Sequence, residues 1–204
     1  MPVQISVVIP AYNAADFLRN CLGNLRLSTA PFECIVVDDG STDNSIVVAK
    51  EFGAKVVSTG GRFGPAKARN LGARHATGDV LFFIDSDVCV YPDTVERVKA
   101  HFEADPDLAA VVGSYDDTPK RADFLSQYKN LMHCFVHHTA RREACTFWSG
   151  CGAIRKEVFF AHSGFDESYG RPAIEDIELG YRMARAKCKM ILDASVQVKH
   201  LKAW

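Results

Sequence analysis

Short runs of almost continuous apolar residues recur through the first half of the chain and are separated by amphipathic segments. A strand that is apolar along its whole length is typical of a parallel sheet with helices on both faces, since neither of its faces meets water. The sequence therefore predicts an α/β domain of Rossmann-like type, with a mixed, mostly parallel sheet sandwiched by helices. The expected strands are 5–9, 32–37, 54–58, 80–84 and 108–113.

Helix signals fill the spaces between these runs. Ser41 or Thr42 is expected to cap a helix that runs to Phe52, with Gly53 at its end, and Pro65 and Pro92 are each expected to open a helix. The strict alternation stops near residue 116. The other expected elements are helices over 14–27, 123–138 and 175–186 and strands over 147–154, 189–192 and 196–200.

Length and composition limit the choice of function. With 204 residues, 48% of them hydrophobic, and a net charge of -1, we expect one packed domain and no nucleic-acid partner. Its two parts would be a nucleotide-binding half, 1–115, and an acceptor-binding half, 116–204. Seven scattered cysteines without a C-x-x-C pair favour reduced thiols. The start of the chain lacks a secretory signal, and its apolar runs are too short to span a bilayer, so we expect a soluble, cytoplasmic domain.

Carboxylates follow two of the predicted strands directly. In open α/β sheets, ligands bind at the carboxyl ends of the strands, where Asp38-Asp39 and Asp85-Ser86-Asp87 occur. The second group suits a hard divalent cation that would bridge the carboxylates to phosphates. An acidic turn without function remains the alternative for Asp85 and Asp87. For Asp38 and Asp39, capping of the next helix is the alternative.

The order of the motifs carries more information than any one of them. It resembles the family 2 glycosyltransferases with the GT-A fold, and the resemblance covers essentially the whole chain. The motifs are VVIPAYN at 7–13, VVDDGSTD at 36–43, GPAKARN at 64–70, FFIDSD at 82–87, WSGCGA at 148–153, GFD at 164–166, EDIEL at 175–179 and VKH at 198–200.

The resemblance implies a role for each matching position. Asp176 would be the general base, and Asp87 and His200 would approach the metal. Trp148, Gly150 and Glu175 would lie near the acceptor or the donor sugar. The implied nucleotide-binding residues are Pro10, Ala11, Tyr12 against the base, Asp39 on the base edge with support from Arg69, Asp85 toward the ribose or the water shell of the metal, and Ser86.

Alternatives exist for three of these roles. Glu175 is a competing base, Asp176 could instead cap its helix, and His200 could be a strand-end histidine without a functional part. His133 and His137 have a zinc-like spacing but lack the H-E-x-x-H pattern. With His138, Arg141 and Arg142, they are expected to form a solvated polar face; a face toward an acceptor phosphate or a membrane surface is the alternative.

The implied reaction is inverting transfer of a sugar from a nucleoside-diphosphate sugar, with UDP as the first choice, to an acceptor hydroxyl. The cofactor would be Mn²⁺ or Mg²⁺, and the acceptor a saccharide or a lipid-linked molecule. A nucleotidyltransferase and a non-catalytic nucleotide-sugar-binding module are the alternatives. Because further residues follow the histidine-leucine-lysine ending in similar bacterial proteins, we expect either a piece of a longer protein or a naturally minimal catalytic domain. Segments outside this chain could then hold it at the cytoplasmic face of a membrane.

Overall fold

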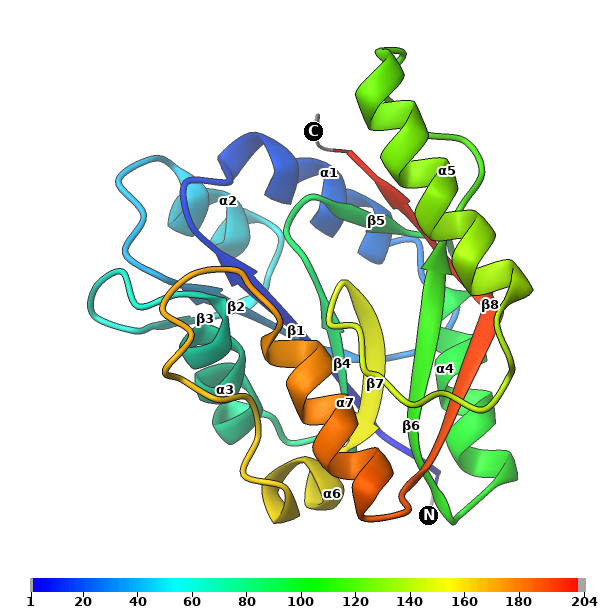
Figure 1. Cartoon of the computed structure of the whole chain (residues 1–204). Helices are drawn as coiled ribbons and strands as arrows, with labels where there is room; N and C mark the ends of the chain where they lie inside the picture. Colours follow the sequence, from blue (N-terminus) through cyan, green and yellow to red (C-terminus); the bar gives the residue numbers. More distant parts are fainter. Residues whose placement is uncertain (1, 202–204) are drawn as a thin grey trace.

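An eight-stranded sheet runs through the molecule in the order β3-β2-β1-β4-β7-β6-β8-β5 (Figure 1). The structure is a computed structural model and describes residues 2–201. The strands are β1 (Ile5–Ala11), β2 (Glu33–Asp38), β3 (Lys55–Ser58), β4 (Val80–Ile84), β5 (Val88–Val90), β6 (Leu108–Tyr115), β7 (Cys151–Arg155) and β8 (Lys189–His200). The helices are α1 (Ala15–Leu25), α2 (Ser45–Glu51), α3 (Pro65–His75), α4 (Thr94–Ala104), α5 (Phe124–Thr139), α6 (Lys156–Ala161) and α7 (Glu175–Arg185).

The strand directions bring distant parts of the chain to one edge. β1 pairs in parallel with β2 and β4, and β2 pairs in parallel with β3. β7 is antiparallel to both β4 and β6, while β8 is parallel to β6 and antiparallel to β5. β1, β2, β4, β6 and β8 therefore all end at the edge where β7 begins. The expected mixed, mostly parallel sheet is confirmed.

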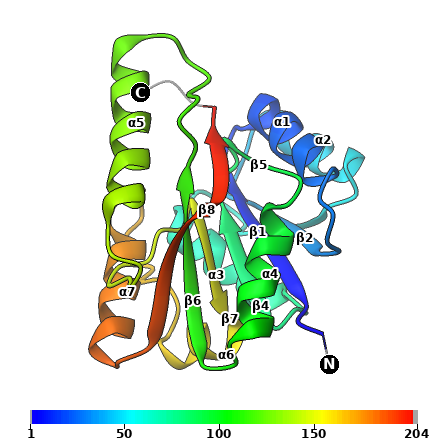
Figure 2. The ribbon, with the colours of Figure 1, turned by 90° about the vertical axis from the view of Figure 1, so that its right-hand side faces the viewer.

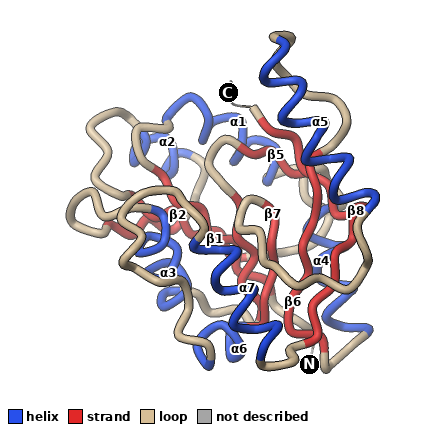
Figure 3. Tube along the Cα trace, in the orientation of Figure 1, coloured by secondary structure: helices blue, strands red, loops and turns tan. Residues whose placement is uncertain are grey.

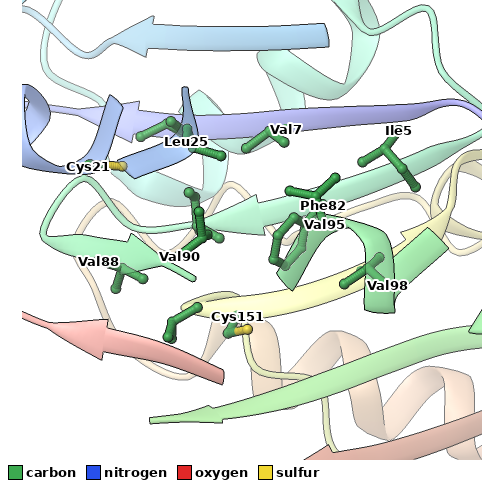
Figure 4. Close-up of a cluster of buried hydrophobic side chains, with 14 of the residues drawn as sticks. Ile5, Val7, Cys21, Leu25, Phe82, Val88, Val90, Val95, Val98 and Cys151 are labelled. Atoms are coloured by element: carbon green, nitrogen blue, oxygen red, sulfur yellow. The ribbon is translucent and has the colours of Figure 1, made fainter. Parts of the chain in front are cut away.

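Alternate residues of the central strands enter two different cores. Val7 and Phe82 belong to a core closed by α1, α2 and α4, part of which Figure 4 shows. Val8 and Phe83 point to the other face, where α3, α6 and α7 supply the partners. This two-sided burial is the physical reason for the continuous apolar runs, because both faces of each strand are withdrawn from water. Figure 2 shows the sheet between its helices.

Several expected boundaries were wrong. α2 begins at Ser45, and neither Ser41 nor Thr42 caps it, because Asp43 accepts hydrogen bonds from the Ser45 backbone N–H and hydroxyl. Pro92 lies in the turn before α4 rather than opening it. Gly53, with φ of 76°, ends α2 as expected.

The second half holds the larger differences. The strand expected over 147–154 starts only at Cys151, and β8 is one strand whose pairing with β6 shifts register, not two strands. β5 and α6 were not anticipated, since three and six residues are too short to show a period. Figure 3 shows the long loops beside the ends of β1 and β2 and the loop that leads into α7.

Candidate active site

The site is built where strand ends from both halves of the chain meet. β1 and β2 are paired to their last residues, with Pro10 opposite Val37 and Ala11 opposite Asp38. Thr42 donates its backbone N–H to Asn13 Oδ1 at 2.8 Å, which ties together the loops that follow the two strands. Pro10 and Ala11 therefore form a rigid wall, and Tyr12, directly after them, exposes its ring at the rim.

Asp39 is buried and organises the glycine-rich loop. Its carboxylate accepts the backbone N–H of Phe63 at 3.0 Å and that of Gly64 at 2.7 Å, together with the Thr59 hydroxyl at 3.0 Å. The Phe63 N–H also reaches the second carboxylate oxygen at 3.2 Å, so the loop engages all of the about four lone-pair sites of this carboxylate. Helix capping by Asp39 is not what the structure shows, because these donors all belong to the loop between β3 and α3.

The turn that follows Asp38-Asp39 needs glycine where it approaches this loop. Gly40 has φ of 83°, and a Cβ atom there would lie 2.8 Å from the backbone carbon of Gly61. Above the loop, the guanidinium of Arg62 lies 4.1 Å from the centre of the Tyr12 ring. A flat, exposed aromatic ring and a cation thus lie together at the end of β1.

Arg69 joins β4 to α7 through two carboxylates. Its Nη2 lies 2.6 Å from Asp85 Oδ1 and its Nη1 lies 3.0 Å from Glu175 Oε1, and both Arg69 and Glu175 are buried. We expected Arg69 to support Asp39, and this was wrong, because α3 directs the guanidinium toward the end of β4. Burial raises the pKa of Asp85 even though the Arg69 cation opposes that rise, and Asp87 adds to it.

Asp87 and His200 approach each other across the site. His200 Nε2 lies 3.6 Å from Asp87 Oδ2, and the backbone N–H of Leu201 donates to the Asp87 carbonyl at 2.9 Å. Behind them, the buried Tyr115 ring stacks on His200 with centroids 4.8 Å apart. Ser86 lies half-buried in the turn between β4 and β5. The antiparallel pairing of β5 with β8 holds this corner together.

Carboxylate oxygen and imidazole nitrogen are both donors that Mn²⁺ accepts, and Mg²⁺ prefers the oxygen. Among residues 2–201, no three His, Cys, Asp or Glu side chains form a group that could hold a metal by themselves. Asp87 and His200 could therefore hold a cation only together with ligands from outside the protein. Mg²⁺ in particular keeps several non-protein ligands of this kind.

Asp176 lies in the first turn of α7. Its Oδ2 accepts the backbone N–H and the hydroxyl of Ser149, both at 3.0 Å, and its Oδ1 accepts the backbone N–H of Ile177 at 2.8 Å. The residue that precedes α7 is Ile174, so Asp176 is not its N-cap. Gly150 cannot carry a side chain, because a Cβ atom would lie 2.7 Å from the Trp148 indole.

Two histidines that we placed on a solvated face belong to this site. The rings of His133 and His137 lie 5.4 and 5.2 Å from that of Trp148, and their Nδ1 atoms are buried without a hydrogen-bond partner. Burial lowers the pKa of His133 and lowers that of His137 to about 4. The spacing of four residues was visible in the sequence, but nothing there indicated that this helix turns its polar side inward. Tyr115, the last residue of β6, was also missed.

Comparisons with known proteins agree with this geometry. The family described as Glycosyl transferase family 2 matches residues 6–161. A validoxylamine A glucosyltransferase of Streptomyces hygroscopicus subsp. limoneus is 30% identical over 88% of this chain and 47% of its own length. The uncharacterized glycosyltransferase YibD of Escherichia coli is 38% identical over 52% of this chain and 33% of its own length. The chain thus spans a third to a half of these relatives.

Solved structures show the same fold at low sequence identity. Mannosyltransferase PcManGT from Pyrobaculum calidifontis, in complex with GDP-Man and Mn²⁺, superposes with a TM-score of 0.77 at 22% identity, over 98% of this chain and 57% of that one. TarS 1-349 of S. aureus in complex with UDP-GlcNAc gives 0.72 at 19%, over 98% of this chain and 59% of that one. The chain therefore belongs to glycosyl transferase family 2 and has the GT-A fold.

Proposed function

We propose that this domain transfers a sugar from a nucleoside-diphosphate sugar to an acceptor hydroxyl, with inversion at the anomeric carbon. Asp176 is the general base in this proposal, and Mn²⁺ or Mg²⁺ assists the departure of the nucleoside diphosphate. The main observation behind this proposal is that Arg69 contacts both Asp85 and Glu175. One buried cation joins the carboxylate at the end of β4 to the start of α7, so the metal-facing residues and the base are fixed to each other.

The end of β1 and the glycine-rich loop suit a nucleoside. Tyr12 offers an exposed ring with which a base can stack, and Asp39 would accept a base N–H in exchange for one of its loop contacts. Uracil, whose imide N–H is one such donor, is our first choice. The known structures with this fold include one in complex with GDP-Man and one with UDP-GlcNAc, so the base has to be measured.

The diphosphate would lie between this nucleoside site and the Asp87–His200 corner. Asp87, with help from His200, would hold the cation through its carboxylate. When bound, the cation offsets the negative charge that collects on the leaving diphosphate. The buried Tyr115 ring keeps His200 turned toward Asp87, and Arg69 keeps Asp85 in place. These residues arrange the leaving group without taking part in proton transfer.

Asp176 is better suited to act as base than its neighbour. Glu175 is buried, and its carboxylate is paired with the Arg69 cation at 3.0 Å, whereas Asp176 has no cation among its hydrogen-bond partners. Asp176 is half-buried, and Ser149 orients its carboxylate through two hydrogen bonds. Its carboxylate would take the proton of the acceptor hydroxyl while that oxygen attacks the anomeric carbon. A single displacement inverts this carbon.

The acceptor would reach Asp176 past Trp148. The indole, with His133 and His137 packed beside it, offers an aromatic surface for a sugar ring. We keep a saccharide and a lipid-linked molecule as acceptor classes. The whole protein would act in the cytoplasm, or at the cytoplasmic face of a membrane.

Calorimetry with UDP, GDP and dTDP tests the donor site, with Mn²⁺ or Mg²⁺ and again with EDTA. We expect one nucleotide to bind in a metal-dependent way, and the metal dependence to disappear in Asp87→Ala. Asp107→Ala removes an exposed carboxylate away from the site and should bind like the unaltered chain. Equal binding of all three nucleotides in EDTA would contradict the proposal. Release of pyrophosphate from a nucleoside triphosphate would instead favour a nucleotidyltransferase.

A further inference from the structure

Helix α5 buries part of its polar side and exposes much of its apolar side. Its polar side faces the protein, where Ser126 and Asn130 are buried and Asn130 Nδ2 donates to the Asp116 carbonyl at 3.1 Å. His133 and His137 continue this inner side toward Trp148. Figure 2 shows α5 along the outer margin of the molecule, with the rest of the chain on one side of it. The side of α5 that faces away from the protein therefore needs its own explanation.

The outward side of α5 is mainly apolar, although Gln127, His138 and Thr139 are also exposed on this helix. Phe124 is 83% exposed and Phe135 is 66% exposed, and they lie at the two ends of a shallow groove on the helix. The stripe repeats at intervals of three and four residues, which is the spacing of one helix face. Isolated exposed apolar residues are ordinary, but a continuous aromatic and aliphatic stripe marks a surface that binds something. The stripe consists of Phe124, Tyr128, Leu131, Met132 and Phe135.

Basic residues flank this stripe at both ends. Lys120 and Arg121 precede α5, Arg141 and Arg142 follow it, and all four are exposed. Asp123 and Glu143 adjoin this segment, and Arg121 Nε lies 3.8 Å from Asp123 Oδ2, but between residues 124 and 142 the sequence has no aspartate or glutamate. An apolar helix face with cations beside it is the pattern of a helix that lies in the headgroup layer of a membrane, with its apolar side toward the acyl chains.

We propose that the outward face of α5 binds the surface of an anionic lipid bilayer. The charges argue against a second copy of this chain as the occupant. In a two-fold dimer the α5 helices would run antiparallel, with Lys120 and Arg121 of one near Arg141 and Arg142 of the other, or parallel, with each basic end near its own copy. Like charges there would oppose association, whereas anionic headgroups would attract both ends of the helix.

The docking concerns a surface and not the reacting site, so it goes beyond the proposed function. It also differs from anchoring by a membrane span, since no helix within residues 2–201 is long and apolar enough to cross a bilayer. A helix with its side chains is about 10 Å across. Because His133, His137 and Trp148 lie on the opposite side of the same helix, docking would hold this part of the site about one helix diameter from the lipid headgroups.

Vesicle flotation of the 204-residue chain tests the proposal directly. We expect it to bind vesicles of phosphatidylcholine with phosphatidylglycerol, and to bind vesicles of phosphatidylcholine alone much more weakly. Phe124→Ser with Phe135→Ser should lower the partition coefficient by roughly tenfold or more, because the two most exposed rings of the stripe are lost. Arg141→Gln with Arg142→Gln should lower it about 25-fold on the anionic vesicles only, at about fivefold for each charge.

Matched control variants distinguish binding through this surface from nonspecific binding through other exposed apolar or basic side chains. Leu27→Ser with Tyr181→Ser removes two equally exposed apolar side chains elsewhere, and Lys50→Gln with Arg185→Gln removes two exposed cations elsewhere. Both control pairs should bind vesicles like the unaltered chain, and all variants should keep its circular dichroism and thermal unfolding, since the changed residues are exposed.

Two results would overturn the proposal. The first is vesicle binding that is absent in the unaltered chain or unchanged in the Phe124 and Phe135 pair. The second is a concentration-dependent dimer in analytical ultracentrifugation that this pair dissolves while no vesicle binding occurs, which would assign the face to a second copy.

Discussion

The two halves of the site differ in how completely their polar groups are satisfied. On the nucleotide side, Asp39 is held by the loop and Arg69 bridges two carboxylates, so the cradle is formed before any ligand arrives. On the acceptor side, His133 and His137 keep buried nitrogens without partners. Buried polar atoms without partners are unfavourable unless a ligand or water completes them. The difference suggests a rigid donor site that faces an acceptor site with hydrogen-bonding capacity to spare.

The base on the acceptor side gives the largest expected effect. Asp176→Asn keeps an oxygen that can accept from Ser149 but cannot take a proton at neutral pH. We expect kcat to fall about 10²–10⁴-fold while donor affinity measured by calorimetry stays the same. Glu175→Gln is the informative companion, because it should alter the Arg69 contact without removing the base. If Glu175→Gln loses as much kcat as Asp176→Asn and at unchanged stability, the assignment of the base is wrong.

Removing the Arg69 bridge between Asp85 and Glu175 should lower the stability of the fold. Arg69→Met leaves Glu175 buried without its cation, and we expect the free energy of unfolding in urea to fall by about 3–5 kcal/mol. Arg74→Met, on the same helix but in an exposed pair with Glu167 at 3.8 Å, should change it by less than about 1 kcal/mol. Adding Glu175→Met to Arg69→Met should recover part of the loss. Similar losses in the Arg69 and Arg74 variants would show that the buried bridge contributes no more to stability than the exposed ion pair does.

The glycine-rich loop allows a smaller and more local test of rigidity. Gly40→Ala should lower the free energy of unfolding by about 2–3 kcal/mol, because φ is positive and the new Cβ would press on the Gly61 backbone. Gly53→Ala has a similar positive φ but nothing within 4 Å of the new Cβ, so the loss should be about 1 kcal/mol. Urea unfolding measures both. Equal losses would mean that the loop moves to make room for the new Cβ atom, and that the donor site is less rigid than proposed.

The burial of His137 predicts a modest pH dependence of stability. Burial, helped by His133, lowers the pKa of His137 to about 4, while an unfolded histidine has a pKa of about 6.5. Between these values the unfolded chain binds more protons than the folded one, so this contribution to stability is full above pH 6.5 and is lost as the pH falls toward 4. We expect about 1 kcal/mol, because the ring is only partly buried.

Urea unfolding of the unaltered chain and of His137→Gln at several pH values isolates the contribution of His137 to stability. The difference in unfolding free energy between the two should shrink or change sign as the pH falls, since only the unaltered chain has to exclude that proton. A difference that does not vary with pH would show that the acceptor side is already solvated.

Much of the first half followed from its sequence. Strands such as Val80–Ile84 are apolar throughout because both of their faces are buried, so their position could be read from composition alone. The ends of these strands then placed Asp39, Asp85 and Asp87 at one edge. Side-chain partners were less predictable. The contacts of Arg69 depend on the direction in which α3 crosses the sheet, which no local pattern encodes.

The sequence by itself determined the α/β class, the edge that carries the site and the membership of the family, because these depend on periodicity and on the order of motifs. Only the tertiary structure decided that Arg69 joins Asp85 to Glu175, and that α5 turns His133 and His137 inward and its aromatic stripe outward. A helix pattern shows that two faces differ, but which face is buried depends on what the neighbouring strands present to it. Here β6 presents Tyr115 and the loop before β7 presents Trp148, so the polar face of α5 became the inner one.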